Sequence, residues 1–328
     1  MERPIIHQIE DISYPILAAV GVPVNILAIV ILSRGKCGLS TCITRYLVAM
    51  ATADLLFVII DVILFRLSDY YFPGSFLDHT SVCTVNVVLL HAAMDSSVWL
   101  TVTFSFDRFV AICWQKLKTK YCTEKTAAVV IATTCILSCL KNVPWYFAYE
   151  PWEIIDNAAW GCVTKASFSI DPRWVAFDWF GKTLTPLLPF VVIVLLNALT
   201  VRCILVASRV RKRLRGQSQG ENRNDPEMES RKKSVILLFT VSGTFILLWL
   251  LFVIHSLYYS VTNEYIDDVN DASYISGEIG YLLKNSSSCT NTFIYLVTQT
   301  KFREQLKSAV KYPVTGILKL IKQRKALT

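Results

Sequence analysis

The stretch from Ser97 to Cys113, SVWLTVTFSFDRFVAIC, ends a long apolar segment with a charged pair, Asp107 and Arg108. The apolar residues continue back from this stretch to about residue 81. A helix that crosses a bilayer needs about 20 mostly apolar residues. Residues 81–113 meet this length, so the sequence predicts a membrane-spanning helix with the charged pair at one end.

Further apolar segments of spanning length occur along the chain, separated by polar or charged stretches. The chain has 328 residues, of which 53% are hydrophobic and 18% are charged, whereas a soluble domain carries about 25% charged residues. We therefore predict an all-α membrane protein, a seven-transmembrane helix bundle. Its segments are residues 13–33, 44–68, 81–113, 126–148, 179–208, 233–260 and 274–298.

Lysine and arginine are unevenly distributed between the two sides of this bundle. They concentrate in residues 34–45, 116–125 and 209–233 and in the tail, whereas the opposite loops hold only Arg3, Lys165 and Arg173. The positive-inside rule then places the N-terminus outside and the C-terminus in the cytoplasm. The net charge of +8 is accordingly expected to face acidic lipid and an acidic protein partner, and not nucleic acid.

The chain is predicted to divide into three parts. Residues 1–12 form an extracellular N-terminus, residues 13–299 the seven-transmembrane domain, and residues 300–328 a cytoplasmic surface helix and tail. Phe302, Leu306 and Val310 recur at four-residue spacing among basic residues, which is typical of a short amphipathic helix on a membrane surface. A frayed, solvated tail is the alternative.

Polar residues lie where the segments should be apolar. Asp54 is in the middle of the second segment, and such a residue costs about 2.5–3.5 kcal/mol on insertion scales. Asn25, Ser97, Ser288 and Asn291 lie in three other segments. Because lipid offers no hydrogen-bond partners, we expect these groups to converge inside the bundle. Two interpretations remain, a sodium site of oxygen ligands around Asp54 and a hydrogen-bond network that joins the helices. Sodium is the only cofactor that the sequence suggests.

A disulfide is predicted at the outer end. Cys83 precedes Arg108 by 25 residues, which is about 37 Å of helix, so Cys83 lies at the opposite end from Arg108. The outer side is oxidising, and Cys162 is the only cysteine between the fourth and fifth segments. A Cys83–Cys162 bridge follows, with two free thiols as the alternative.

Several short motifs occur in a fixed order along these segments, and through them the chain resembles rhodopsin-like (class A) G-protein-coupled receptors over nearly its whole length. The stretches Ser97–Cys113 and Leu32–Leu56 are also similar to the orphan "probable G-protein-coupled receptor 139"-like group. The motif residues are Gly21 with Asn25, Asp54, Cys83 with Cys162, Asp107–Arg108–Phe109, Phe245 with Trp249, Asn291 with Tyr295, and Phe302.

The resemblance implies a receptor, and not an enzyme, that binds an extracellular small molecule or short peptide and activates a heterotrimeric G protein. It assigns coupling and switching to Asp107, Arg108, Phe109, Phe245, Trp249, Asn291 and Tyr295. Among the departures of the chain from the family pattern, Leu251 and Thr292 stand where the family usually has proline. Proline is the usual cause of a kink, so both helices are expected to be straighter here.

A ligand pocket is predicted among the outer halves of four segments from the depth of their residues. Lys284 is the most distinctive member, because a buried ammonium needs a partner. Asp61, Glu278 or a carboxylate of the ligand could supply one. The predicted pocket residues are Leu90, His91, Met94, Lys182, Thr185, Phe252, His255, Tyr281 and Lys284.

Three other functions are weighed against a receptor. A transporter or channel predicts repeated halves and broken helices, and the sequence shows no repeats. An intramembrane enzyme needs a catalytic cluster, but the four histidines are scattered. A light-sensing variant would use Lys284 to hold its chromophore.

Overall fold

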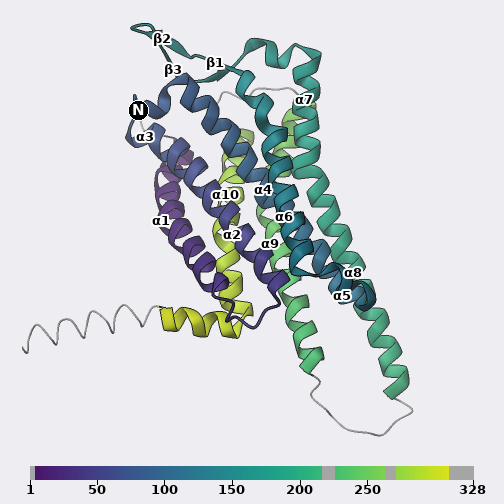
Figure 1. Ribbon diagram of the computed structural model, residues 1–328. Helices are drawn as coiled ribbons and strands as arrows, with labels where there is room; N and C mark the ends of the chain where they lie inside the picture. The colour runs from purple at the N-terminus through teal and green to yellow at the C-terminus, as the bar shows by residue number, and fades with distance from the viewer. Residues whose placement is uncertain (1–3, 216–225, 263–270, 310–328) are drawn as a thin grey trace, which may run out of the picture.

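The computed structural model describes residues 4–215, 226–262 and 271–309, and within them seven long helices form one bundle (Figure 1). Six of the seven are long and apolar enough to cross a membrane. The last helix is more polar, but it packs against α1 and α9 as part of the bundle. The predicted fold is therefore confirmed. The long helices are α1 (Ile5–Ser33), α2 (Thr41–Phe57) continued by η1 (Val58–Leu67), α4 (Thr80–Cys113), α6 (Glu124–Asn142), α7 (Pro172–Lys182) continued by η5 (Thr183–Leu187) and α8 (Leu188–Arg215), α9 (Pro226–Thr262) and α10 (Ala272–Thr298).

Short elements close the two ends of the bundle. Strand β1 pairs antiparallel with β4, and β2 pairs with β3 through a tight turn at Asp156 and Asn157, which both have positive φ. Asp and Asn tolerate this conformation, which two-residue hairpin turns require. The short elements are α3 (Ser68–Tyr71), η2 (Phe76–Asp78), α5 (Gln115–Tyr121), η3 (Val143–Phe147), β1 (Tyr149–Glu150), β2 (Glu153–Ile155), β3 (Ala158–Trp160), β4 (Val163–Thr164) and η4 (Ala166–Ser169).

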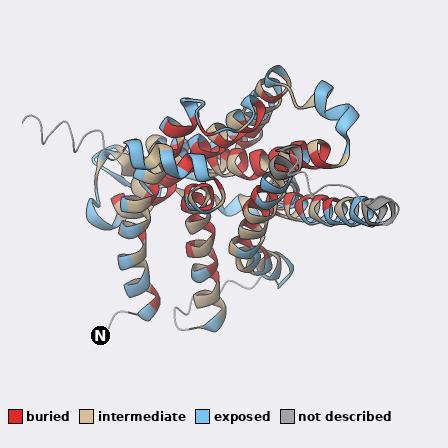
Figure 2. Ribbon diagram, turned by 90° about the horizontal axis from the view of Figure 1, so that it is seen from below, coloured by how far each residue is buried: buried red, intermediate tan, exposed pale blue. Residues whose placement is uncertain are grey.

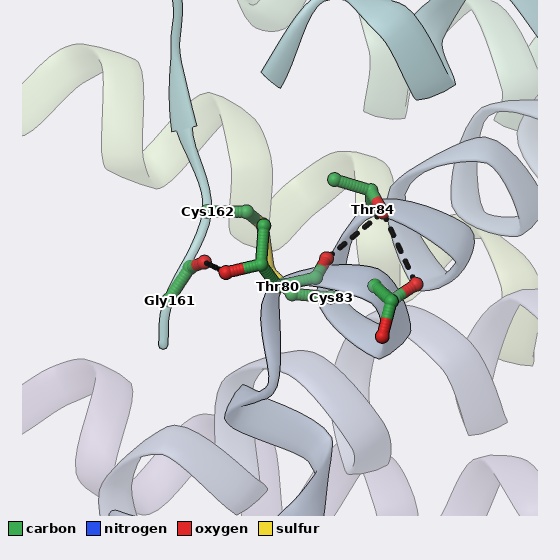
Figure 3. Close-up of a disulfide and its surroundings, with 6 residues drawn as sticks. Thr80, Cys83, Thr84, Gly161 and Cys162 are labelled. Atoms are coloured by element: carbon green, nitrogen blue, oxygen red, sulfur yellow. Dashed lines mark hydrogen bonds between the residues drawn. A yellow bond between two sulfur atoms is a disulfide. The ribbon is translucent and has the colours of Figure 1, made fainter. Parts of the chain in front are cut away.

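The predicted disulfide is present. It joins Cys83, in the first turn of α4, to Cys162 beside the hairpin, with a Cα–Cα distance of 6.0 Å (Figure 3). Thr80 Oγ1 donates a hydrogen bond to the Gly161 carbonyl at 2.7 Å and so ties the same two segments together. We call this end of the bundle the disulfide end, and the opposite end the Arg108 end.

Buried residues face the middle of the bundle and exposed residues its rim, as the view from the Arg108 end shows (Figure 2). Many rim residues are large and apolar, for example Leu247, which is 72% exposed, and Val129, which is 65% exposed. Exposed apolar patches of this extent mark a surface that something apolar covers. A lipid bilayer is the covering that the lengths of these helices fit.

Two stretches of the long helices have π-helical hydrogen bonding, and they are not in the helices where family prolines are missing. They are η1, which follows α2, and η5, which contains Pro186 and is interrupted by a kink at Thr185, whose backbone angles are not helical. Helices α9 and α10 each run unbroken. Short π-helical stretches are frequent at functional sites, and η1 carries two ionisable residues, Asp61 and Arg66.

Helix α1 begins at Ile5, earlier than the apolar segment that starts at residue 13. Its first turns are polar, but their side chains have partners within the structure. His7 Nδ1 lies 3.0 Å from Glu10 Oε2, so these two side chains pair with each other within the helix. The segment expected as an N-terminal extension is thus largely the beginning of α1.

A short helix crosses the Arg108 end after α10 (Figure 1). Residues 300–309 are helical, Phe302 is fully buried with its ring 5.9 Å from that of Tyr295, and Leu306 is partly buried against the core. This agrees with the predicted amphipathic helix as far as residue 309. The predicted contribution of Val310 lies outside the described residues.

Candidate functional site

Asp54 lies at the junction of α2, α4 and α10 and is 1% exposed. Ser97 Oγ donates a hydrogen bond to Asp54 Oδ1 at 2.5 Å, and Asn291 Nδ2 donates one to Oδ2 at 2.8 Å. Both carboxylate oxygens therefore have a partner from another helix. The structure brings together these three of the five polar residues that were expected to converge.

Asn25 and Ser288 form a separate contact between α1 and α10. Asn25 Nδ2 donates to the Ser288 carbonyl at 2.9 Å and to the Gly21 carbonyl at 3.0 Å. Thr292, which stands in the position expected for proline, donates from Oγ1 to the Val24 carbonyl at 3.1 Å. The threonine thus adds a tie between two helices that a proline side chain would not supply.

Arg108 is buried at the opposite end of α4, where it is 4% exposed. Its guanidinium pairs with Asp107, with Nε donating to Oδ2 at 3.0 Å, and it reaches Ser234 Oγ of α9 at 3.4 Å. Asp107 also accepts a hydrogen bond from Cys42 Sγ at 3.3 Å. The charged pair is therefore compensated within α4 and touches both α2 and α9.

The loop between α5 and α6 adds a further contact to Asp107. Cys122 Sγ donates to the Asp107 carbonyl at 3.6 Å. Burial of the thiol, followed by the nearby Asp107 charge, raises the pKa of Cys122 to about 12. The thiol therefore stays protonated at neutral pH and can donate. Phe109, the third residue of the motif, is buried and packs edge-on to Trp114 at 5.3 Å.

A cavity of about 320 Å³ opens beside Arg108. Its lining includes Arg108, Lys118, Lys233 and Lys301, and no acidic side chain is among the described residues that line it. Charges of one sign in a cavity raise the local concentration of the opposite charge. The cavity is therefore suited to an anionic group.

A series of aromatic side chains on α9 and α10 leads from the middle of the bundle toward the disulfide end. Phe245 and Trp249 have ring centroids 5.1 Å apart, Trp249 and Phe252 5.8 Å, and Phe252 and Tyr281 5.2 Å. Met94 of α4 packs against the same cluster. These rings thus form a continuous series along α9, and Phe252 joins it to Tyr281 of α10.

Lys284 is surrounded by aromatic rings at the end of this series. Its Nζ lies 5.3 Å from the ring centroid of Phe57, 5.0 Å from that of Phe252 and 4.9 Å from that of Tyr281. The side chain is buried, and no ion pair joins it to a carboxylate in the described part of the chain. Cation–π contacts stabilise an ammonium, but the expected pairing with Asp61 or Glu278 is not formed.

Unpaired polar atoms gather close to Lys284, around the guanidinium of Arg66. Arg66 lies 4.0 Å from Glu278 and its Cζ is 5.3 Å from the ring centroid of Tyr14. We call Tyr14, Asp61, Arg66, Glu278 and Lys284 the Arg66 cluster. Within the described residues, Tyr14 Oη, Asp61 Oδ2, Arg66 Nε and Glu278 Oε2 are buried without a hydrogen-bond partner.

The other predicted pocket residues do not share one wall. His91 stacks on Trp145 beside α6 at 4.5 Å, and Lys182 pairs with Asp178 of its own helix at 2.7 Å. Thr185 accepts a hydrogen bond from Trp99 Nε1 at 3.2 Å.

Leu90 packs against the buried cluster of Phe57, and the His255 ring lies against Gly277 of α10. Of the predicted set, Leu90, Met94, Phe252, Tyr281 and Lys284 are therefore brought together around Trp249 and Phe57. None of the nine lines the cavity beside Arg108.

Sequence reasoning missed one buried charged pair. Asp95 of α4 is 1% exposed, and its Oδ2 lies 2.7 Å from Lys141 Nζ and accepts a hydrogen bond from Asn142 at 2.6 Å. A signal was available, because a charged residue inside a spanning segment indicates a partner in a neighbouring helix. Arg66, which also lies inside a predicted spanning segment, was missed as well, although the same signal was available.

Comparison with known proteins decides the family of this bundle. A family model described as "7 transmembrane receptor (rhodopsin family)" matches residues 24–295. The chain belongs to this family. It is thus a multi-pass membrane receptor and not an enzyme.

Three of the curated relatives of this receptor are similar at low identity. The FMRFamide receptor of Drosophila melanogaster is 22% identical over 88% of the chain and 51% of its own length. Neuropeptide receptor 22 of Caenorhabditis elegans is 25% identical over 89% and 67%, and C-C chemokine receptor type 1 of Macaca fascicularis is 21% identical over 93% and 80%. The chain therefore spans about half the length of the first relative.

Proposed function

We propose that this receptor binds a ligand near the Arg66 cluster and activates a heterotrimeric G protein at the Arg108 end. The observation that carries the proposal is the cavity beside Arg108, with basic side chains and a buried arginine that contacts α9 through Ser234. An arginine held by its own neighbour, Asp107, can exchange that partner for a docking protein when α9 moves.

The proposed orientation places the disulfide end outside the cell. A disulfide forms and persists in an oxidising compartment, and Cys83 and Cys162 are bonded at that end. The basic residues of the other end favour the cytoplasmic face of the plasma membrane.

The proposed ligand is a peptide or small molecule that carries a negative group. The printed names of two relatives, an FMRFamide receptor and a neuropeptide receptor, favour a peptide. Lys284 is buried among rings without a carboxylate partner in the described structure. A terminal or side-chain carboxylate of the ligand would compensate its charge. The stretches Ser97–Cys113 and Leu32–Leu56 support a place near the orphan group named above.

Asp54 is proposed to hold a sodium ion in one of the receptor's conformations. The carboxylate and the Ser97 hydroxyl are oxygen ligands of the kind such an ion takes. Asn291 presents its amide nitrogen to Asp54, so its amide group would have to turn to offer its oxygen. The residues therefore fit a sodium ion after one side-chain rotation.

Coupling between the two ends follows from a shift between conformations. A ligand favours one arrangement of the helices only by its different affinity for the two. Lys284 and Tyr295 lie on α10, and Trp249 and Ser234 lie on α9. These two helices pack together along their length, so a ligand that reorients Lys284 can act on both ends through rigid elements.

The test is G-protein nucleotide exchange in cells that express the receptor, with amino acids and short peptides as ligands. We expect Arg108→Ala to abolish the response at equal surface expression. Arg34→Ala, which changes an exposed arginine at the same end, should respond like the wild type. An undiminished response of Arg108→Ala would remove this residue, and the proposed docking at its cavity, from the mechanism.

A further inference from the structure

A second cavity lies at the disulfide end, between the first turns of α1 and the segment η1–α3 (Figure 1). Its volume is about 270 Å³, whereas one water molecule occupies about 30 Å³. Acidic, basic and aromatic side chains line it, and none of the nine predicted pocket residues is among them. The cavity is thus large enough for a polar group of several atoms, outside the predicted pocket.

Two buried polar atoms of the lining have no hydrogen-bond partner within the described residues. They are Oη of Tyr14, which is 5% exposed, and Nε of Arg66. The ion pair of Arg66 with Glu278 is 4.0 Å long, whereas a charge-assisted hydrogen bond is about 2.7–2.9 Å long. Buried donors are nearly always paired. Two such donors in one cavity therefore indicate an anionic group that accepts hydrogen bonds from both.

The lining has a second layer, about one helical turn closer to the disulfide end. Asp11 precedes Tyr14 by three residues, and Tyr70 follows Arg66 by four. Tyr70 Oη donates a hydrogen bond to Asp11 Oδ2 at 3.4 Å, and the ring of Tyr71 lies edge-on to that of Tyr70 with 4.8 Å between centroids. A carboxylate beside aromatic rings favours a cation. The cavity thus offers donors in its deeper layer and a cation site in its outer layer.

The depth of the cavity corresponds to the surface of a bilayer. Asp54 is the middle residue of the spanning segment Thr41–Leu67. Arg66 follows it after about 18 Å of helix, and half of the hydrocarbon core is about 15 Å thick. Arg66 therefore lies near the boundary between the hydrocarbon and the lipid headgroups. Phe65 and Tyr71 line the cavity and are 39% and 52% exposed, so its wall continues onto the outer surface of the bundle.

We propose that this cavity binds the phosphocholine headgroup of a phospholipid from the leaflet at the disulfide end. The phosphate lies in the deeper layer and accepts hydrogen bonds from Tyr14 and Arg66. The quaternary ammonium lies in the outer layer, beside Asp11 and the rings of Tyr70 and Tyr71. The phosphate joins the choline to the glycerol of the lipid, so the two groups enter the cavity in this order.

The signs of the lining charges select a headgroup that carries both charges. Arg66 is basic, whereas Glu10 and Asp11 are acidic. A headgroup with phosphate alone would bring a further negative charge against the two carboxyl groups, and a cation alone would leave the donors of Arg66 without an acceptor. A zwitterion satisfies both layers. The aromatic rings favour a quaternary ammonium, which such rings recognise.

The bound headgroup would connect the lipid to the Arg66 cluster. It bridges α1 and η1 and contacts the guanidinium from the rim of the bundle, whereas the proposed ligand compensates Lys284 from within. The lipid site goes beyond the proposed function, because it requires neither that ligand nor a G protein.

The experiment titrates dihexanoyl phosphatidylcholine into the purified full-length receptor in a maltoside detergent, and native mass spectrometry measures the bound lipid. We expect the wild type to retain this lipid in preference to dihexanoyl phosphatidylglycerol, which has no ammonium. Tyr14→Phe removes only the hydroxyl without a partner, so it should unfold at the wild-type temperature and bind the lipid at least about tenfold more weakly. Tyr146→Phe, at an exposed tyrosine of η3, is the matched control and should bind like the wild type.

A second variant tests the outer layer. Tyr71→Leu changes a side chain at the surface and should lower the preference for phosphatidylcholine by roughly two- to fivefold. Equal retention of both lipids by the wild type, or equal binding by the wild type and Tyr14→Phe, would overturn the proposal. Free phosphocholine that binds as tightly as the lipid would overturn the membrane as its source. These measurements contain no G protein, so this proposal and the proposed coupling function can fail separately.

Discussion

Asp54 and Asp61 lie seven residues apart on one continuous helix, and both are buried. The two oxygens of Asp54 accept hydrogen bonds from Ser97 and Asn291. Asp61 Oδ2 has no hydrogen-bond partner among the described residues, and neither has Arg66 Nε close by. One acid therefore sits in a complete network, and the other sits in an incomplete one.

This difference separates two kinds of site. Buried polar groups are nearly always paired, so a group without a partner indicates water, an ion or a ligand. The Asp54 network lies in regular α-helix, whereas Asp61 lies in the π-helical stretch η1. In this conformation, the Asp54 network ties three helices together without a further ligand, whereas the Arg66 cluster is a place that a ligand completes.

The largest effect is expected at a third charged centre, where the buried Asp95 carboxylate is paired with Lys141 and Asn142 through Oδ2. Lys141→Met would leave the Asp95 carboxylate buried without its cation. Breaking such a pair from one side costs about 3–5 kcal/mol, whereas replacing both partners by apolar residues costs far less. Thermal unfolding of Lys141→Met and of the double variant with Asp95→Leu measures both values. A single variant as stable as the wild type would contradict the burial of this pair.

Alanine at the two acids of α2 and η1 compares the two regions directly. Asp54→Ala leaves the Ser97 hydroxyl and the Asn291 amide without their acceptor, at about 1–3 kcal/mol for each buried donor. Asp61→Ala removes an oxygen that has no partner and should cost less than about 1 kcal/mol. Unfolding of both variants in the same detergent is the measurement. An equal loss at both positions would end the distinction between the regions.

A smaller effect is expected where α1 meets α10. A Cβ on Gly21 would lie 2.8 Å from Cys289 Sγ, whereas a Cβ on Gly181 would meet nothing within 4 Å. Both substitutions by alanine gain helix propensity of about 1 kcal/mol. Gly21→Ala should lose that gain to overpacking, so Gly181→Ala should be the more stable variant. If Gly21→Ala were the more stable variant, the α1–α10 contact at Gly21 would have room for an added methyl group.

The smallest effect concerns sodium. Sodium bound at Asp54 should stabilise the receptor by about 1.4 kcal/mol when its concentration is ten times the dissociation constant. Asp54→Asn should abolish this increase, and Asp61→Asn should keep it. Choline chloride at equal ionic strength is the control. Equal stabilisation by sodium and by choline would reduce Asp54 to a hydrogen-bonding role.

The sequence predicted features that depend on local pattern. Apolar segments of spanning length predicted the bundle, and the position of Cys83 on its helix predicted the bond to Cys162. Features that depend on how helices face one another were not predicted. The pairing of Asp95 with Lys141 needs the rotation of α4 against α6, and the two separate networks of Asp54 and Asn25 need the positions of four helices, α1, α2, α4 and α10.

The start of α1 shows the same limit. Residues 5–12 are too polar to be read as part of a spanning segment, yet they are helical, and His7 and Glu10 pair with each other within α1. Polar side chains three residues apart on a helix can stabilise one another, so the helix continues beyond the apolar pattern. The cage of Lys284 is similar, because its three rings come from α2, α9 and α10.

The central claim is that the disulfide end and the Arg108 end are coupled, and coupling between two binding sites is reciprocal. The most direct test measures the affinity of an activating ligand with and without a nucleotide-free G protein bound. We expect the G protein to tighten ligand binding by about 5–150-fold, and Arg108→Ala to remove this gain. Equal affinity with and without the G protein would contradict the claim.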